Sequence, residues 1–267
     1  QYVDQDKMHT LNYQGNYFQV KGPLNIDRSE QGQPVIFQAG ASPKGQAYAA
    51  QYADAVFIIG ESIESAVKNY DSIKQQAVEY GRQPDDIKIY PILSPILGET
   101  IDIAEARYDE IKSLTTIEEA LTYLGRYYDH HDFSQYELDA PFPELGDVGK
   151  NSFRATTEAI AQRARDNNLT LRQVALEETT RKSPFFGTYK DVAQTIIDWF
   201  EAGAADGFIF GPHIYGDNYE EFINNVLPIL EAKGYYDATY QGTTLRENIG
   251  VPFKANRYQQ QSVEHTK

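Results

Sequence analysis

The sequence predicts an α/β fold built on a parallel sheet, and three observations support this class. Short apolar runs rich in β-branched residues alternate along the chain with amphipathic helical patterns, as in consecutive βα units. One of these runs ends in a turn of small residues that leads directly into a helix. The 267 residues are enough for one large domain of this class or two small ones.

The first βα unit, residues 34–50, is the stretch around which the rest of the chain is organised. Residues 35–37 have the β-branched and aromatic bias of a buried strand, which is expected to end at Gly40. Ser42 is a favourable N-cap, and Pro43 suits the first helical position, where its missing N–H costs nothing.

The turn of this unit is a candidate anion site. Backbone amides between Ala41 and Gly45 are expected to point out of the helix start, where the helix dipole favours a phosphate or another anion. An ordinary turn that binds nothing would have the same spacing, so both interpretations stay open at this point.

Further elements follow in chain order. Apolar runs predict strands at 53–60, 87–93 and 206–212, and helical periodicity predicts helices at 63–80, after Thr100, at 188–203 and at 219–233. Pro91 is expected to cause a bulge or an early strand end, and Pro228 to kink the last helix. Residues 12–20 predict a hairpin that turns at Gly15-Asn16.

The alternation breaks between about residues 115 and 182, which we interpret as a helical insertion within a single domain of 267 residues. It contains a capping-box spacing at Thr115–Glu118, a loop at 129–149, and helical patterns at 154–165 and 170–180. Residues 234–267 form an extended tail without a clear period. The four predicted strands can form a small open sheet or half of a closed eight-stranded barrel.

The composition argues against several classes of function and binding site. A net charge of −15 argues against a nucleic-acid partner, because phosphate contacts need clustered Lys and Arg. The absence of cysteine excludes thiol catalysis and zinc thiolate sites and is compatible with a reducing compartment. No apolar stretch approaches a membrane span, and the polar, acidic N-terminus lacks signal-peptide features, so a cytoplasmic location away from membranes is expected.

Three ordered motifs carry a resemblance that spans nearly the whole chain. They are Gly22–Asn25 running into 34–45, Phe186–Thr188 followed by 199–208, and Tyr240–Asn248. Together they resemble the bacterial-luciferase-like flavin monooxygenases, in the branch that holds nitrilotriacetate, dibenzothiophene-sulfone and long-chain alkane monooxygenases.

The resemblance implies a (β/α) barrel of the TIM type, of which this chain would supply the C-terminal half-barrel: four parallel strands and a helical insertion. It implies reduced FMN (FMNH2) as a co-substrate that a separate NAD(P)H–flavin reductase supplies, with O2 as oxidant and a small organic molecule as substrate. A deazaflavin-dependent reductase of the same superfamily fits the residues near Thr243 less well.

Matched position by position, the resemblance implies that Ala41 and Ser42 contact the FMN phosphate. Gln38 and Gly40, at the end of the preceding strand, are further candidates for cofactor binding. Ala41 stands where relatives often have serine, so a lower phosphate affinity is expected. Gln38 could instead satisfy backbone groups. His213 follows the last strand and is a candidate for the substrate pocket; no catalytic residue is identified.

The remaining expectations concern metals and assembly. His130 and His131 are interpreted as solvated loop residues, and no metal site is expected. A half-barrel would expose two apolar sheet edges, so we expect a homo-oligomer, most simply a dimer, that covers them. The alternative function is a non-catalytic half-barrel remnant that oligomerises and binds flavin weakly or not at all.

Overall fold

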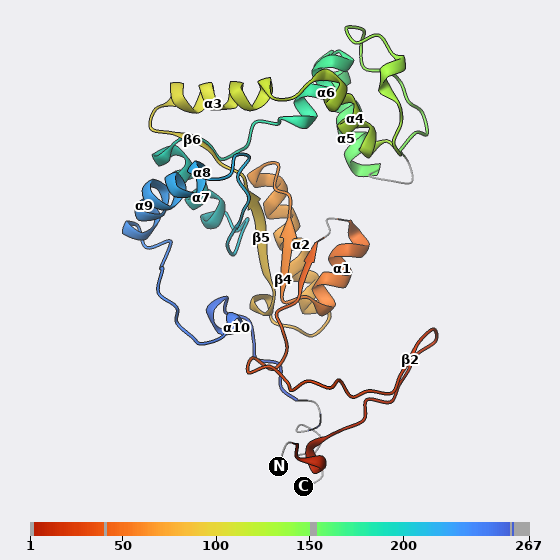
Figure 1. The fold of residues 1–267 in the computed structure, drawn as a ribbon, viewed down its shortest axis with the longest axis vertical. Coiled ribbons are helices and arrows are strands. Elements are labelled where there is room, and N and C mark those ends of the chain that lie inside the picture. The colour runs from red at the N-terminus through yellow and green to blue at the C-terminus, as the bar shows by residue number, and fades with distance from the viewer. Residues whose placement is uncertain (1–2, 40–41, 150–153, 257, 259–267) are drawn as a thin grey trace. The chain divides into compact units, whose positions relative to one another are not determined.

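The computed structural model describes residues 3–39, 42–149, 154–256 and 258 (Figure 1). Contacts divide the chain into two compact units. The first comprises residues 1–91, 203–209 and 237–267, and the second comprises 92–202 and 210–236. That the chain folds as a single domain, as expected from the sequence, stays a prediction.

A four-stranded sheet with the order β3-β4-β5-β8 confirms the predicted α/β class and its four strands. The strands are β3 (Phe37–Ala39), β4 (Ala55–Ile58), β5 (Lys88–Leu93) and β8 (Ile209–Phe210). β3 runs parallel to β4, and β4 runs parallel to β5. Figure 1 shows β4 and β5 side by side, with α2 next to them.

One face of the first unit's strands is covered by two helices, α1 (Pro43–Tyr52) and α2 (Ile63–Glu79). Val56 and Ile89 lie opposite each other in the register and are fully buried in a cluster with alanines of α1 and with Ile73 and Ala77 of α2. Small residues on α1 let the helix approach the sheet closely, which explains why this helix is rich in alanine.

Pro91 does not end β5, so the expectation of a bulge or an early end was wrong. The strand continues to Leu93, and Pro91 stays in register with Ile58. Proline forfeits one N–H, but its fixed φ is compatible with an extended strand, so the chain keeps its direction.

The second unit contains a strand pair that the sequence did not predict. β6 (Ile96–Gly98) and β7 (Phe186–Thr188) run parallel and form a separate two-stranded sheet. They flank α3 (Ile101–Ser113) and the insertion and precede α7 (Tyr189–Glu201). Neither segment belongs to an apolar run of strand length, so only tertiary pairing reveals them.

The insertion is a helical cluster, as predicted. Its helices are α4 (Ile117–Tyr127), α5 (Arg154–Asp166) and α6 (Leu171–Thr179), and their buried residues form a core with Tyr128 and Phe133. The capping box is one residue later than expected: Thr116 caps α4 and Glu119 completes the box. Both registers have the same spacing, and only the helix start decides between them.

The predicted helix near Pro228 is irregular. α8 (Asp217–Glu221) passes into a π-helical turn at Phe222–Val226, and α9 (Leu227–Ala232) follows. Pro228 stands in the first turn of α9, directly after the π-helical turn.

The remaining described elements are short. The predicted hairpin is confirmed by β1 (Tyr13–Gln14) and β2 (Gln19–Val20), but its turn lies one residue later than expected, at Asn16-Tyr17, because Gly15 pairs with Phe18. The tail carries α10 (Leu245–Asn248). Three 3₁₀ turns lie at Gln5–Lys7, Pro84–Asp86 and Phe133–Gln135. None of the helices in the described part of the chain has the length and apolar character that crossing a membrane requires.

Candidate functional site

β3 ends at Ala39 and α1 begins at Pro43, close to the strand end and helix start that the sequence predicts. Ser42 is the N-cap, and its Oγ accepts a hydrogen bond of 3.2 Å from the Gly45 amide. Pro43 occupies the first helical turn, and the Ser42 carbonyl accepts from the Gln46 amide at 2.8 Å. The N-cap therefore holds the start of α1 in one geometry.

The amides at this helix start are fewer than the sequence suggested. Pro43 has no N–H, and the Gly45 amide is engaged by Ser42 Oγ. Within the described part of the chain, the amides of Ser42 and Lys44 have no hydrogen-bond partner. Gly40 and Ala41 lie outside the described residues, so their predicted contacts stay predictions.

Gln38 is half-buried, and its side-chain amide donates a 2.9 Å hydrogen bond to the Ala39 carbonyl. It pairs in register with Val56, so it belongs to the face of the sheet that the helices cover. The sequence left two roles open for Gln38, contact with the cofactor or satisfaction of a backbone group. The structure shows a contact with a backbone group. A role for Gln38 in cofactor binding stays a prediction.

His213 follows β8, as expected, and belongs to the second unit, whereas Gln38 and Ser42 belong to the first. Its side chain keeps an exposed surface, yet desolvation by the surrounding protein lowers the pKa of the imidazole. The ring is therefore predominantly neutral at pH 7, which suits a hydrogen-bonding role in a pocket better than a charge-pairing one.

The histidine pair of the insertion has ordinary loop contacts. His131 Nε2 lies 2.9 Å from the Tyr136 hydroxyl, and Asp132 accepts from the Ser134 amide at 2.9 Å. In the described ranges no cluster of three or more potential ligand residues is arranged to hold a metal ion.

The structure contains two buried ion pairs in the first unit that the sequence did not predict. Arg246, from the third motif, pairs with Asp54, and Lys74 Nζ lies 3.0 Å from the Asp206 carboxylate. Asp54 directly precedes β4, and Asp206 accepts from the amide of Ile89 near the start of β5. Both pairs thus lie where strands begin, the edge of parallel sheets that serves stability rather than chemistry. An acidic residue placed before an apolar run is the signal that could have identified them.

Residues 6–206 match the luciferase-like monooxygenase family. The chain is 38% identical over 260 residues to N-acetyl-S-(2-succino)cysteine monooxygenase of Bacillus subtilis, covering 97% of this chain and 59% of the relative. It is 33% identical over 248 residues to nitrilotriacetate monooxygenase component A of Aminobacter aminovorans, covering 92% and 54%.

A solved structure agrees with the sequence relatives. The crystal structure of a riboflavin lyase with modified FMN and its substrate riboflavin superposes with a TM-score of 0.77 at 30% identity, covering 95% of this chain and 55% of that one. These matches confirm the resemblance carried by the three motifs. The chain spans a little over half the length of the curated relatives it matches.

Proposed function

Because the chain belongs to the luciferase-like monooxygenase family, we propose that it takes part in the flavin-dependent oxygenation of a small organic molecule. Reduced FMN, delivered by a separate NAD(P)H–flavin reductase, would supply the electrons that activate O2. Two relatives support this proposal: one is named as component A of a monooxygenase, and a structural neighbour was crystallised with modified FMN.

The observation that carries the proposal is the capped start of α1. Ser42 caps a ten-residue helix that follows a parallel strand, and the free amides of Ser42 and Lys44 add to the positive end of the helix dipole. These donors fit a phosphate group, so this chain would hold the FMN phosphate here, with Gly40 and Ala41 as further contacts. His213 would line the substrate pocket.

Assembly and location belong to the same proposal. We expect a homo-oligomer, most simply a dimer, because an open sheet edge exposes unpaired backbone groups. Light scattering at micromolar concentration tests this, and a monomer there would contradict it. A cytoplasmic location suits a reaction that draws on NAD(P)H.

The phosphate site is tested by Ser42→Ala, with Thr116→Ala as the matched control. Both substitutions remove a side-chain N-cap, from α1 and from α4 respectively. We expect Ser42→Ala to weaken FMN binding roughly tenfold, measured by quenching of flavin fluorescence, since one hydrogen bond to a charged group is lost. Thr116→Ala should leave the affinity unchanged.

Activity is measured as NADH-dependent O2 uptake with a flavin reductase present, in excess of the uncoupled oxidation of reduced flavin. A wild-type chain that neither quenches flavin fluorescence nor raises O2 uptake would contradict the proposed function. Equal affinities of the two variants would contradict the placement of the phosphate at Ser42.

A further inference from the structure

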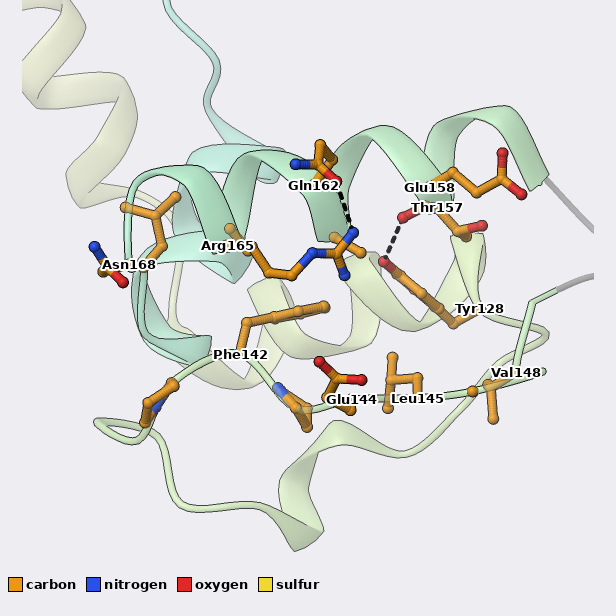
Figure 2. Close-up of a pocket in the computed structure, with 16 residues that line it drawn as sticks. Tyr128, Phe142, Glu144, Leu145, Val148, Thr157, Glu158, Gln162, Arg165 and Asn168 are labelled. Carbon is orange, nitrogen blue, oxygen red and sulfur yellow. Dashed lines mark hydrogen bonds between the residues drawn. The ribbon is translucent and has the colours of Figure 1, made fainter.

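The insertion contains a cavity of about 750 Å³, well within the range of small-molecule sites (Figure 2). One wall is the loop 141–148 and the other is a face of α5. The predicted loop 129–149 thus contributes to a cavity, and every residue that lines it belongs to the second unit.

The loop wall is held in place by hydrogen bonds. The Phe142 amide donates to the Leu169 carbonyl at 3.0 Å, and the Leu171 amide donates to the Ala140 carbonyl at 3.1 Å. At the far end, the Gly149 amide donates to Asp129 Oδ2 at 3.1 Å. A wall tethered at both ends keeps its shape, so the cavity is preformed and a ligand would not have to order it.

The loop wall, together with Tyr128, gives the cavity an apolar and aromatic floor. Phe142 lies against Tyr128, with ring centroids 6.2 Å apart, and Leu145 and Val148 pack partly buried against the same core. The Tyr128 hydroxyl donates to the Thr157 carbonyl on α5, so this ring joins the two walls. Such a floor favours a ligand with an aromatic or aliphatic body.

Both walls carry charged side chains: Arg165 and Glu158 line the cavity from α5, and Glu144 lines it from the loop. Arg165 projects from α5, and Glu144 projects from the facing loop (Figure 2). Gln162 fixes the guanidinium, because its Oε1 accepts from Arg165 at 2.8 Å while its Nε2 donates to Asp166 at 2.7 Å. Among the described residues no ion pair joins Arg165 to Glu144, although both line the same cavity.

We propose that this cavity is a binding site for a small zwitterion with an apolar body, of the chemical class of a free amino acid with an aromatic or aliphatic side chain. The Arg165 guanidinium would bind the carboxylate, and the Glu144 carboxylate would bind the ammonium group. The apolar side chain would lie on Phe142 and Leu145. The site is separate from the proposed phosphate contacts and does not rest on the proposed function.

The test is calorimetric titration of the full chain, without flavin, with three probes that share one aromatic body. L-Phenylalanine carries both charges, 3-phenylpropionate carries only the carboxylate, and phenethylamine carries only the ammonium group. We expect L-phenylalanine to bind roughly tenfold more tightly than either analogue, because each analogue forfeits one charge-assisted contact.

Two variants assign the contacts. In Arg165→Gln, L-phenylalanine should bind no better than phenethylamine, and in Glu144→Gln it should bind no better than 3-phenylpropionate. Both side chains are exposed, so neither substitution is expected to disturb folding. Glu137→Gln is the matched control, since Glu137 is an exposed carboxylate of the same loop that does not line the cavity.

A third variant separates binding in the cavity from binding elsewhere. Ala161 lies on the α5 wall, and Ala161→Phe should abolish binding of L-phenylalanine by filling the space. Absence of saturable binding by all three probes would overturn the proposal. So would equal affinity for L-phenylalanine and 3-phenylpropionate in the wild type, or an equal loss in Glu137→Gln.

Discussion

The Arg246 guanidinium forms two hydrogen bonds to the Asp54 carboxylate, and this pair ties the tail to the start of the sheet. Arg246 Nη1 donates to Asp54 Oδ1 at 3.0 Å, and Nη2 donates to Oδ2 at 2.5 Å. The remaining three N–H groups donate to the carbonyls of Gln33, Pro34 and Pro252. Every donor of a buried guanidinium is therefore satisfied, as its burial requires.

The first prediction concerns this pair. Arg246→Ala should lower the free energy of unfolding by about 3–5 kcal/mol, because the Asp54 carboxylate is left buried without its main partner. Arg246→Lys should recover only part of the loss, since an ammonium group cannot reach five acceptors in the planar geometry. Urea denaturation measures both. Arg172→Ala is the control: it breaks an exposed pair with Asp139 and should change stability little, so an equal loss there would contradict the prediction.

The second prediction is a pH dependence. Burial by itself raises the pKa of Asp54, but the hydrogen bonds from Arg246 and Ile36 and the charge of Lys254 outweigh it, so the pKa lies below its ordinary value of 3.8. A carboxyl with a lowered folded-state pKa stabilises the fold above the unfolded-state pKa, and this contribution is lost as the pH falls through the folded-state value. The stability difference between wild type and Asp54→Asn should therefore shrink on acidification below about pH 4. Urea midpoints at pH 6, 4 and 3 measure it, and a constant difference would contradict the assignment.

The third prediction is a coupling between Lys74 and Asp206. The Asp206 carboxylate also accepts from the Tyr70 hydroxyl at 3.0 Å, and Lys74 Nζ donates to the Ile87 carbonyl at 2.7 Å. Lys74→Met leaves a largely buried carboxylate unpaired, whereas Lys74→Met with Asp206→Asn removes both charges. The double variant should lose at least about 1 kcal/mol less than the sum of the single losses, because the two sites share one network. A double-mutant cycle in urea measures the coupling, and additive losses would show that the network is not cooperative.

The fourth prediction compares two glycines with similar backbones. Gly32 and Gly81 have φ values of +87° and +78°, which side-chain-bearing residues rarely adopt. A Cβ at Gly32 would collide with the Lys254 carbonyl, whereas a Cβ at Gly81 meets nothing within 4 Å. Gly32→Ala should therefore lower the stability of the fold more than Gly81→Ala. The Gly81 variant measures the backbone cost alone, which is roughly 1 kcal/mol. Thermal unfolding measures both, and equal shifts in Tm would show that the tail moves aside.

Local chemistry explains which elements the sequence revealed. Ser42 followed by Pro43, and Gly81 after an amphipathic run, have strong positional preferences, so α1 and the end of α2 lie where the residues predicted them. The β6–β7 pair has no such local signal. The start of α1 was predicted correctly, and the same N-cap that Ser42 provides occupies the Gly45 amide, which leaves fewer amides for an anion than expected.

By itself, the sequence determined the alternation of strands and helices, the position of the insertion and the family. Periodicity, capping residues and ordered motifs depend on residues that are close together in the sequence. Only the tertiary structure decided what the long-range partners are. It brought Arg246 to Asp54 across 192 positions, and it set Arg165 and Glu144 on two walls of one cavity. The physical reason is that an ion pair or a cavity depends on which surfaces the folded core brings together, and one local pattern is compatible with many such partners.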